Sequence, residues 1–276
     1  MARANIVASI QRACVPRVVP QACVGRTSVL LSTLAARRFG HAIGGVVAGM
    51  PMIAAPIIGI LLLDHGSVEV RAIALATLAC VPATILHIVT FAAAAPAWNW
   101  RTSVTAALLA YSAAGAVLTH LPLGPIAVCV LAAVAPIAGL RFAATHTPGP
   151  MPVHVPQLEL VLRIAAAVAM AAVIILGADT LPTSVSGILL AVPITGTVLP
   201  CFTLQRYGAA ATTSLTTGFL QGLHGFTAFF LALYWALGVM HPALAFGLAL
   251  AAAIATATGV EAARRFSRKV PAEIGH

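Results

Sequence analysis

The chain has 276 residues, of which 61% are hydrophobic and only 8% are charged, and its mean hydropathy is +1.02. A soluble domain carries about 25% charged residues, and a water-soluble fold of this size has no way to hide so much apolar surface. The composition excludes soluble, disordered, collagenous and disulfide-scaffold proteins. It indicates an integral membrane protein of the all-α class.

The net charge of +9 is less informative than the position of the basic residues. Arg37 and Arg38 precede the first strongly apolar stretch, and four basic residues lie close together near the C-terminus (Arg264, Arg265, Arg268 and Lys269). Such groups favour the cytoplasmic side of a bilayer and contact with anionic membrane lipids. No basic stripe interleaved with aromatic residues is present, so we expect no nucleic-acid binding.

A helix needs about 20 apolar residues to cross the hydrocarbon core. Eight stretches meet this criterion, and a ninth, the first in chain order, is interrupted by Pro20, Gln21 and Arg26. In order they are about 16–36, 41–63, 70–95, 102–120, 123–141, 158–178, 184–204, 214–238 and 242–262. We predict a polytopic transmembrane bundle of about nine helices, or eight if 16–36 lies on the membrane surface.

Prolines 148, 150, 152 and 156 preclude a helix over residues 145–157, which we predict to be a linker loop. The loop separates a first repeat, residues 16–144, from a second, residues 158–262. Residues 263–276 form a basic tail. We interpret residues 1–15 as an N-terminal tail; the arginine-rich, acid-free start resembles a transit peptide in composition but lacks the apolar core of a secretory signal.

The basic residues also predict orientation. With residues 37–41 in the cytoplasm, Arg101, Arg141 and Arg206 all fall inside, and among the loops only Arg71 falls outside. The C-terminus is then cytoplasmic, and we expect the protein in the cell (inner) membrane.

An internal repeat appears when Gly45–Gly66 is aligned without gaps to Gly187–Gly208, at an offset of 142 residues. Four identities result: Gly45 with Gly187, Pro51 with Pro193, Leu62 with Leu204, and Gly66 with Gly208. The same offset superposes the flanking spans. Five spans in the first copy place the second copy in the opposite orientation, which is the inverted-repeat plan of many secondary transporters.

Pro51 and Pro193 lie about seven residues into their spans, and proline inside a helix removes a hydrogen bond and kinks the backbone. We predict paired broken helices at a central cavity, with Pro56 and Pro200 adding second breaks. Thr195 and Thr197 are candidates to satisfy the freed carbonyls. The alternative is ordinary kinks, because proline is common in membrane helices.

The most polar membrane stretch is Thr212–Thr227, where Thr217, Gln221 and His224 share one helix face. They are candidates to line a substrate pathway, with His224 as a proton carrier; alternatively they only make interhelical hydrogen bonds. Gly218 and Gly222 form a GxxxG motif, which predicts close approach of another helix and a homodimer contact.

His87 is the mid-helix ionisable residue of the first copy and a further pathway candidate, although a lone histidine is more often structural. Asp64-His65 and Gln205-Arg206-Tyr207 occupy equivalent positions in the two copies, at opposite membrane faces. They are candidates for gating or headgroup contact, or else polar caps where a helix leaves the bilayer.

No catalytic constellation or metal-ligand spacing is present, and none of the five cysteines forms a CxxC or zinc-like pair. We therefore expect no enzyme activity, cofactor or metal.

The segment Arg37-Arg38-Phe39-Gly40, followed by Gly44-Gly45-Val46-Val47-Ala48-Gly49-Met50-Pro51, resembles uncharacterised bacterial polytopic membrane proteins with a GG-x-x-x-G-[LM]-P motif. Ser186 to Pro193, closing with Gln205-Arg206-Tyr207-Gly208, is similar to the other half of that family. The resemblance covers most of residues 30–262 and implies a two-copy helical fold without a function to carry over. The plan is also similar to the drug/metabolite transporter superfamily, as an analogy of architecture.

The leading hypothesis is a small secondary transporter or flippase-like exporter of a small amphiphilic or neutral molecule. The alternative is a non-catalytic membrane scaffold or accessory subunit that packs against partner helices. A membrane enzyme acting on a lipid comes third and would need polar groups converging at one membrane face.

Overall fold

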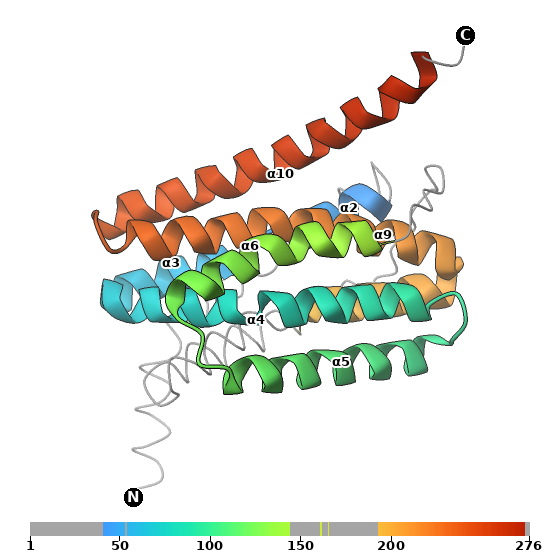
Figure 1. Cartoon of the computed structure of the whole chain (residues 1–276), viewed down its shortest axis with the longest axis horizontal. Coiled ribbons are helices and arrows are strands. Elements are labelled where there is room, and N and C mark those ends of the chain that lie inside the picture. Colours follow the sequence, from blue (N-terminus) through green and yellow to red (C-terminus); the bar gives the residue numbers. More distant parts are fainter. Residues whose placement is uncertain (1–40, 53, 144–160, 162–164, 166–192, 274–276) are drawn as a thin grey trace, which may run out of the picture.

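The computed structural model describes residues 41–52, 54–143 and 193–273, together with residues 161 and 165. In this part of the chain the elements are all helices (Figure 1). They are α2 (His41–Gly49), α3 (Ala54–Asp64), α4 (Ser67–Ala94), α5 (Trp100–His120), α6 (Pro125–Phe142), α9 (Ile194–Ala236) and α10 (Pro242–Glu273). The linker 145–157, the span 16–36 and almost all of the span 158–178 lie outside the described residues.

Four stretches of the described residues are long and apolar enough to cross a membrane: Ile43–Asp64, Ser67–Ala94, Pro125–Phe142 and Pro242–Val260. They coincide with the predicted spans 41–63, 70–95, 123–141 and 242–262. The chain is therefore a helical protein suited to a membrane, as its composition predicts. Helix α5 lies at the predicted span 102–120, but neither it nor α9 is among the four, so the count of about nine spans stays a prediction.

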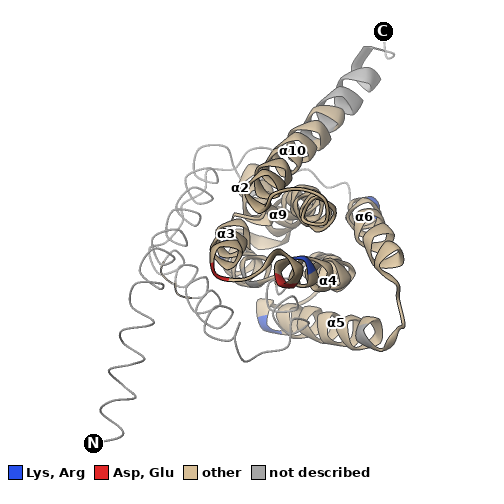
Figure 2. Cartoon of the chain, turned by 90° about the vertical axis from the view of Figure 1, so that its left-hand side faces the viewer, with Lys and Arg blue, Asp and Glu red and all other residues tan. Residues whose placement is uncertain are grey.

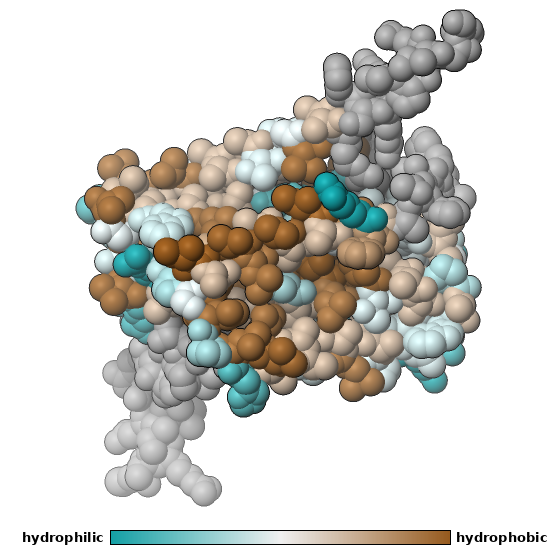
Figure 3. Space-filling model, viewed as in Figure 1, coloured by the Kyte–Doolittle hydropathy of each residue, from teal (hydrophilic) through white to brown (hydrophobic). Residues whose placement is uncertain are grey.

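The surface and the charge distribution agree with a lipid environment. The face viewed in Figure 3 is mostly apolar, and α5 and α6 expose large side chains such as Leu109, Val117, Ile126 and Val130. The charged residues among the described helices are few (Figure 2). Asp64 and Glu69, for example, lie where α3 ends and α4 begins. Because hydrocarbon offers no hydrogen bonds, a helix is the structure that satisfies the backbone of such segments internally.

Local signals in the sequence explain where several helices begin. The Asn99 side chain accepts hydrogen bonds from the amides of Arg101 and Thr102, at 3.0 and 3.1 Å, and so caps α5. Helix α6 begins with Pro125, whose missing N–H costs nothing at the first helical position. These caps place the loop between α4 and α5 at one end of the bundle.

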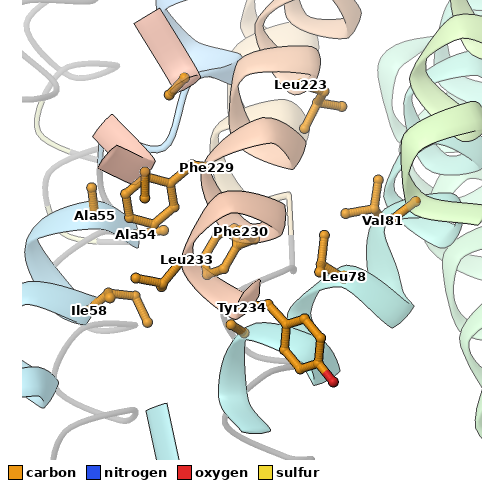
Figure 4. Packing of buried hydrophobic residues seen from close by; sticks show 14 of the residues in the cluster. Ala54, Ala55, Ile58, Leu78, Val81, Leu223, Phe229, Phe230, Leu233 and Tyr234 are labelled. Atoms are coloured by element: carbon orange, nitrogen blue, oxygen red, sulfur yellow. The ribbon is translucent and has the colours of Figure 1, made fainter. Parts of the chain in front are cut away.

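Helix α9 lies in the middle of the bundle, with α2, α3, α4, α6 and α10 around it (Figure 2). Its fully buried Phe229, Phe230 and Leu233 belong to one hydrophobic cluster with Ile58 of α3 and Leu78 of α4 (Figure 4). The core of the protein is therefore the packing of α3 and α4 against the second part of α9.

Residues 184–204 and 214–238 were predicted as two helices, and the described residues agree: α9 (Ile194–Ala236) is divided at Gly208, whose backbone is not helical. Gly196, before this break, lies beside the ring of Phe219, after it. One expectation is wrong. Pro56 and Pro200 produce no breaks: Pro56 lies in the first turn of α3, where its missing N–H is tolerated, and Pro200 lies within helical backbone. Residues 263–273 of the predicted basic tail lie within α10.

Gly208 has φ 78° and ψ −176°, a conformation almost confined to glycine. We expect Gly208→Ala to lower the free energy of unfolding by about 1–3 kcal/mol, as measured by thermal unfolding of the purified protein. Gly66 is the matched control, because it also joins two helices and also has no atom near its missing Cβ, but has φ −70°. Equal losses in Gly208→Ala and Gly66→Ala would show that the kink does not depend on glycine.

Candidate functional site

The break predicted at Pro51 is present. Helix α2 ends at Gly49 and α3 begins at Ala54, with the buried Pro51 between them. The carbonyl of Pro51 accepts a hydrogen bond from the amide of Ala55 at 2.7 Å, so the chain re-enters a helix directly after the proline. Because α2 ends here, its last carbonyls lack the amides of a following helical turn as hydrogen-bond donors.

Pro193 lies directly before the first residue of α9. At the second residue of this helix, the hydroxyl of Thr195 donates to the carbonyl of Ala48, at the end of α2, at 3.4 Å. A side chain that follows one predicted break thus satisfies a carbonyl freed by the other. The structure brings Pro51, Pro193 and Thr195 together, although they are separated by about half of the chain.

His87 of α4 is fully buried, and its Nε2 lies 3.1 Å from the hydroxyl of Thr197 in α9. The Thr197 hydroxyl also lies 2.8 Å from the carbonyl of Pro193 and donates to it. Because a hydroxyl has one proton, this second bond favours His87 as the donor to Thr197. His87 and Thr197, both predicted pathway residues, therefore meet directly beside the start of α9.

Pro200 contributes to this arrangement although it does not break its helix. Its missing N–H leaves the carbonyl of Gly196, four residues earlier, without its usual partner. The ring of His87 lies beside the backbone carbonyls of Gly196 and of Ala107 in α5. A histidine from a neighbouring helix is one of the ways in which such a carbonyl is accommodated in a membrane protein.

Two residues of α5 that sequence reasoning missed lie at the same place. The rings of His87 and Tyr111 are perpendicular, with centroids 6.3 Å apart. The Tyr111 hydroxyl, the Ser103 hydroxyl and Nδ1 of His87 are buried without a hydrogen-bond partner. An unpaired buried polar group costs about 1–3 kcal/mol. No sequence motif marks Ser103 or Tyr111, because their significance depends on which helix covers them.

The face with Thr217, Gln221 and His224 lies elsewhere. On α9 these residues fall between Leu220, which contacts Gly139 of α6, and Gly225, which contacts α10. The His224 ring bonds the carbonyl of Leu220 at 2.9 Å, one turn earlier in its own helix. Gln221 is buried, and the hydroxyl of Thr217 is buried without a partner. The structure thus separates this face from His87 and Thr197, which lie at the contacts of α4 with α5 and the start of α9.

Three other threonines of this stretch are already satisfied, whereas the hydroxyl of Thr227 is buried without a partner. Thr212, Thr213 and Thr216 donate to carbonyls three or four residues earlier in the helix, at 2.9–3.1 Å. This pattern is common for threonine in membrane helices. Their polarity therefore requires no pathway.

The GxxxG motif is used inside the chain. A Cβ on Gly222 would overlap the carbonyl oxygen of Val46 in α2, and a Cβ on Gly49 would overlap that of Phe219. Gly218 lies in the same contact, beside Gly45. Two glycine pairs with a spacing of four thus let α2 and α9 cross with backbones touching. The surface through which Gly218 and Gly222 were predicted to hold a homodimer is occupied by α2.

The residues predicted for gating lie at helix ends. Asp64 is the last residue of α3, and Nδ1 of His65 lies 3.3 Å from the carboxylate of Glu69 in the first turn of α4. Gln205 and Arg206 are exposed, directly before the kink at Gly208. These positions fit polar caps at the ends of helices, and a gating role for them stays a prediction.

The described residues contain no group of three or more histidine, cysteine or acidic side chains placed to hold a metal ion. Over the part of the chain that the structure describes, the fold and site define a membrane-embedded helical protein in which the break between α2 and α3 meets the start of α9 beside a buried histidine. No known protein family, curated protein or solved structure matches the chain.

Proposed function

We propose that the protein is a small secondary transporter or flippase-like exporter of a small neutral or amphiphilic molecule, built from two inverted copies of one helical unit. The observation that carries the proposal is the hydrogen bond from Thr195 to the carbonyl of Ala48, which joins the start of α9 to the end of α2 at its break. Broken helices that meet near the middle of the bilayer form the substrate sites of many secondary transporters. Here the junction lies beside His87 and Thr197.

The helix bounds support the duplication. Adding 142 to the bounds of α4 (67 and 94) gives 209 and 236, which are the start and end of the part of α9 that follows its kink. The same shift takes the first residue of α5, Trp100, to the first residue of α10, Pro242. It also takes Gly66, which precedes α4, to the kink residue Gly208.

Backbone hydrogen bonds in the turns after α4 and α9 recur with the same offset. In each bond the amide of the first residue donates to the carbonyl of the second, and the bonds form three matching pairs. The pairs are Ala95 to Phe91 with Leu237 to Leu233 (both 3.0 Å), Ala97 to Ala94 with Val239 to Ala236 (both 3.1 Å), and Trp98 to Ala94 with Met240 to Ala236 (2.9 and 3.0 Å). The next helix is capped similarly, by Oδ1 of Asn99 in one copy and Nδ1 of His241 in the other. Sequence identity is low here, so we attribute the agreement to a shared ancestral unit.

The direction of the helices supports inversion of the second copy. In Figure 1, α4 runs from left to right, and the part of α9 after Gly208 runs from right to left beside it. The loop between α4 and α5 lies at the right end of the bundle, and the loop between α9 and α10 lies at the left end. An inverted pair of this kind permits alternating access, because one copy can rock against the other around a central site.

The charges bear on the mode of coupling. Among the described helices, the acidic residues Asp64 and Glu69 lie at the junction of α3 and α4, away from the break at Pro51. This favours facilitated or histidine-coupled transport over coupling through a buried carboxylate. The scaffold alternative has less support, because the glycine face expected to receive a partner helix is covered by α2.

Cysteine accessibility tests the proposal. The five native cysteines are removed, and single cysteines are placed at Thr195 and Thr197. We expect a membrane-impermeant thiol reagent to label both positions, from outside in intact cells and from inside in inverted vesicles, because alternating access exposes a central site to each side in turn.

Leu109→Cys is the control, because Leu109 is an exposed apolar residue in the middle of α5 and should face lipid. It should stay unlabelled from both sides. Complete protection of the Thr195 and Thr197 positions in an inserted, folded protein would contradict transport through this junction.

A further inference from the structure

Three unpartnered polar atoms lie along the contact between α4 and α5. Ser103 and Ala107 of α5 are fully buried, Tyr111 follows one turn later, and His87 of α4 lies beside Ala107 and Tyr111. The unpartnered atoms are Oγ of Ser103, Nδ1 of His87 and the hydroxyl of Tyr111. Ser103 and Tyr111 are eight residues apart, or about 12 Å along the helix axis. We call these three residues the polar seam.

The second copy shows what the same helix contact requires for packing alone. With the offset of 142, Ser103, Ala107 and Tyr111 correspond to Ala245, Ala249 and Ala253 of α10, all buried against α9. His87 corresponds to Phe229, which is fully buried and packs edge to face on Phe246 at 5.9 Å.

This comparison separates packing from binding. The contact between α9 and α10 uses alanine and phenylalanine at the positions where the contact between α4 and α5 has serine, tyrosine and histidine. The polar atoms of the first copy are therefore not needed to hold a helix pair of this kind together. Packing of the two helices alone therefore does not explain why they are polar.

We propose that the polar seam, closed on its third side by Thr197, binds a small uncharged molecule that carries hydroxyl or amide groups. Each such group both donates and accepts, as do the two hydroxyls of the seam, while Nδ1 of His87 takes whichever role its tautomer leaves open. The molecule is uncharged because no described charged side chain lies at the seam, and a buried unpaired ion is unstable. Arg101, the charged residue nearest to the seam in α5, is exposed at the end of the helix.

The inference rests on the duplication in the proposed function, because it compares residues 142 apart, but it does not require that the bound molecule be transported. Outcomes of the two experiments tell binding and transport apart. Binding at the seam without labelling of Thr195→Cys and Thr197→Cys from both sides would refute transport and keep the site. Labelling of Thr195→Cys and Thr197→Cys from both sides, with no binding of a probe at the seam, would refute the binding site and leave transport standing.

The test is thermal unfolding of the purified full chain with and without a ligand. Unfolding is detected by the exposure of its buried cysteine thiols. The probes are glycerol, erythritol, urea and acetamide, with glycerate and ethanolamine as charged counterparts. The double variant Ser103→Ala/Tyr111→Phe removes two of the three unpartnered atoms and keeps the aromatic ring at position 111. Adding His87→Phe removes the third and introduces the residue found at the corresponding position of the second copy, Phe229. Ser112→Ala is the matched control, because Ser112 is an exposed serine of the same helix.

Without ligand, we expect the double variant to unfold at the same temperature as the wild type or higher, because it loses unpaired buried atoms. At least one uncharged probe should raise the unfolding midpoint of the wild type and of Ser112→Ala on the order of 3 °C more than that of the double variant. The result is read from the difference between the wild type and the double variant, because polyols raise the unfolding midpoint of any protein non-specifically. Equal shifts in wild type and variant with every probe, or a larger difference with the charged probes, would overturn the proposal; the seam would then hold water alone or a different class of ligand.

Discussion

Replacing Gly222 with valine should abolish most of the folded protein. A Cβ at this position would overlap the carbonyl oxygen of Val46 and lie 2.8 Å from Cα of Gly49. Backbone atoms of α2 cannot move aside by changing rotamer, as a side chain could. The helices α2 and α9 would therefore have to separate along their whole crossing. We expect a loss of about 3 kcal/mol or more in the free energy of unfolding, at the upper end of overpacking effects, and a smaller loss for Gly222→Ala.

The measurement is the yield of monodisperse protein in mild detergent together with its unfolding midpoint. Gly247→Val is the control, because Gly247 is an exposed residue within α10 with no atom near its missing Cβ. Its replacement should be neutral or slightly stabilising, since valine has a higher helix propensity than glycine. Similar behaviour of Gly222→Val and Gly247→Val would show that the close crossing of α2 and α9 is wrong.

The sequence predicted the helical class, four of the apolar spans and the break at Pro51. These features depend on hydropathy over about 20 residues or on the chemistry of one residue, and both can be read locally. The sequence also supplied the offset of 142 from four identities, and the helix bounds later agreed with that offset. The count of about nine spans and the inverted arrangement stay proposals.

The sequence did not predict which helix would cover each face. Periodicity correctly placed Thr217, Gln221 and His224 on one face of α9, but it carried no information that this face lies towards α6 and α10, away from His87. For the same reason, Gly218 and Gly222 were assigned to a second copy of the chain. Gly45 and Gly49 have the matching spacing of four, and this signal could have identified α2 as the partner.

Ser103 and Tyr111 could not have been found from their own residue types. In a membrane helix, serine and tyrosine are unremarkable, and they become candidates only because neither finds a hydrogen-bond partner where α4 covers them. Comparison with Ala245 and Ala253, at the corresponding positions of the second copy, would have singled them out once the offset was trusted.

Inversion of the two copies is the central claim, and its test has an all-or-none result. Ala97 and Val239 occupy the same position in the two corresponding turns, 142 residues apart, and both are exposed. In a cysteine-free chain, each is replaced by cysteine and treated with a membrane-impermeant thiol reagent, first in intact cells and then in inverted vesicles.

Arg101 follows the loop with Ala97, and the distribution of basic residues predicts that this loop is cytoplasmic. We therefore expect Val239→Cys to be labelled only in intact cells and Ala97→Cys only in inverted vesicles. Labelling of both positions from the same side would contradict the inverted arrangement, and with it the transport mechanism built on it.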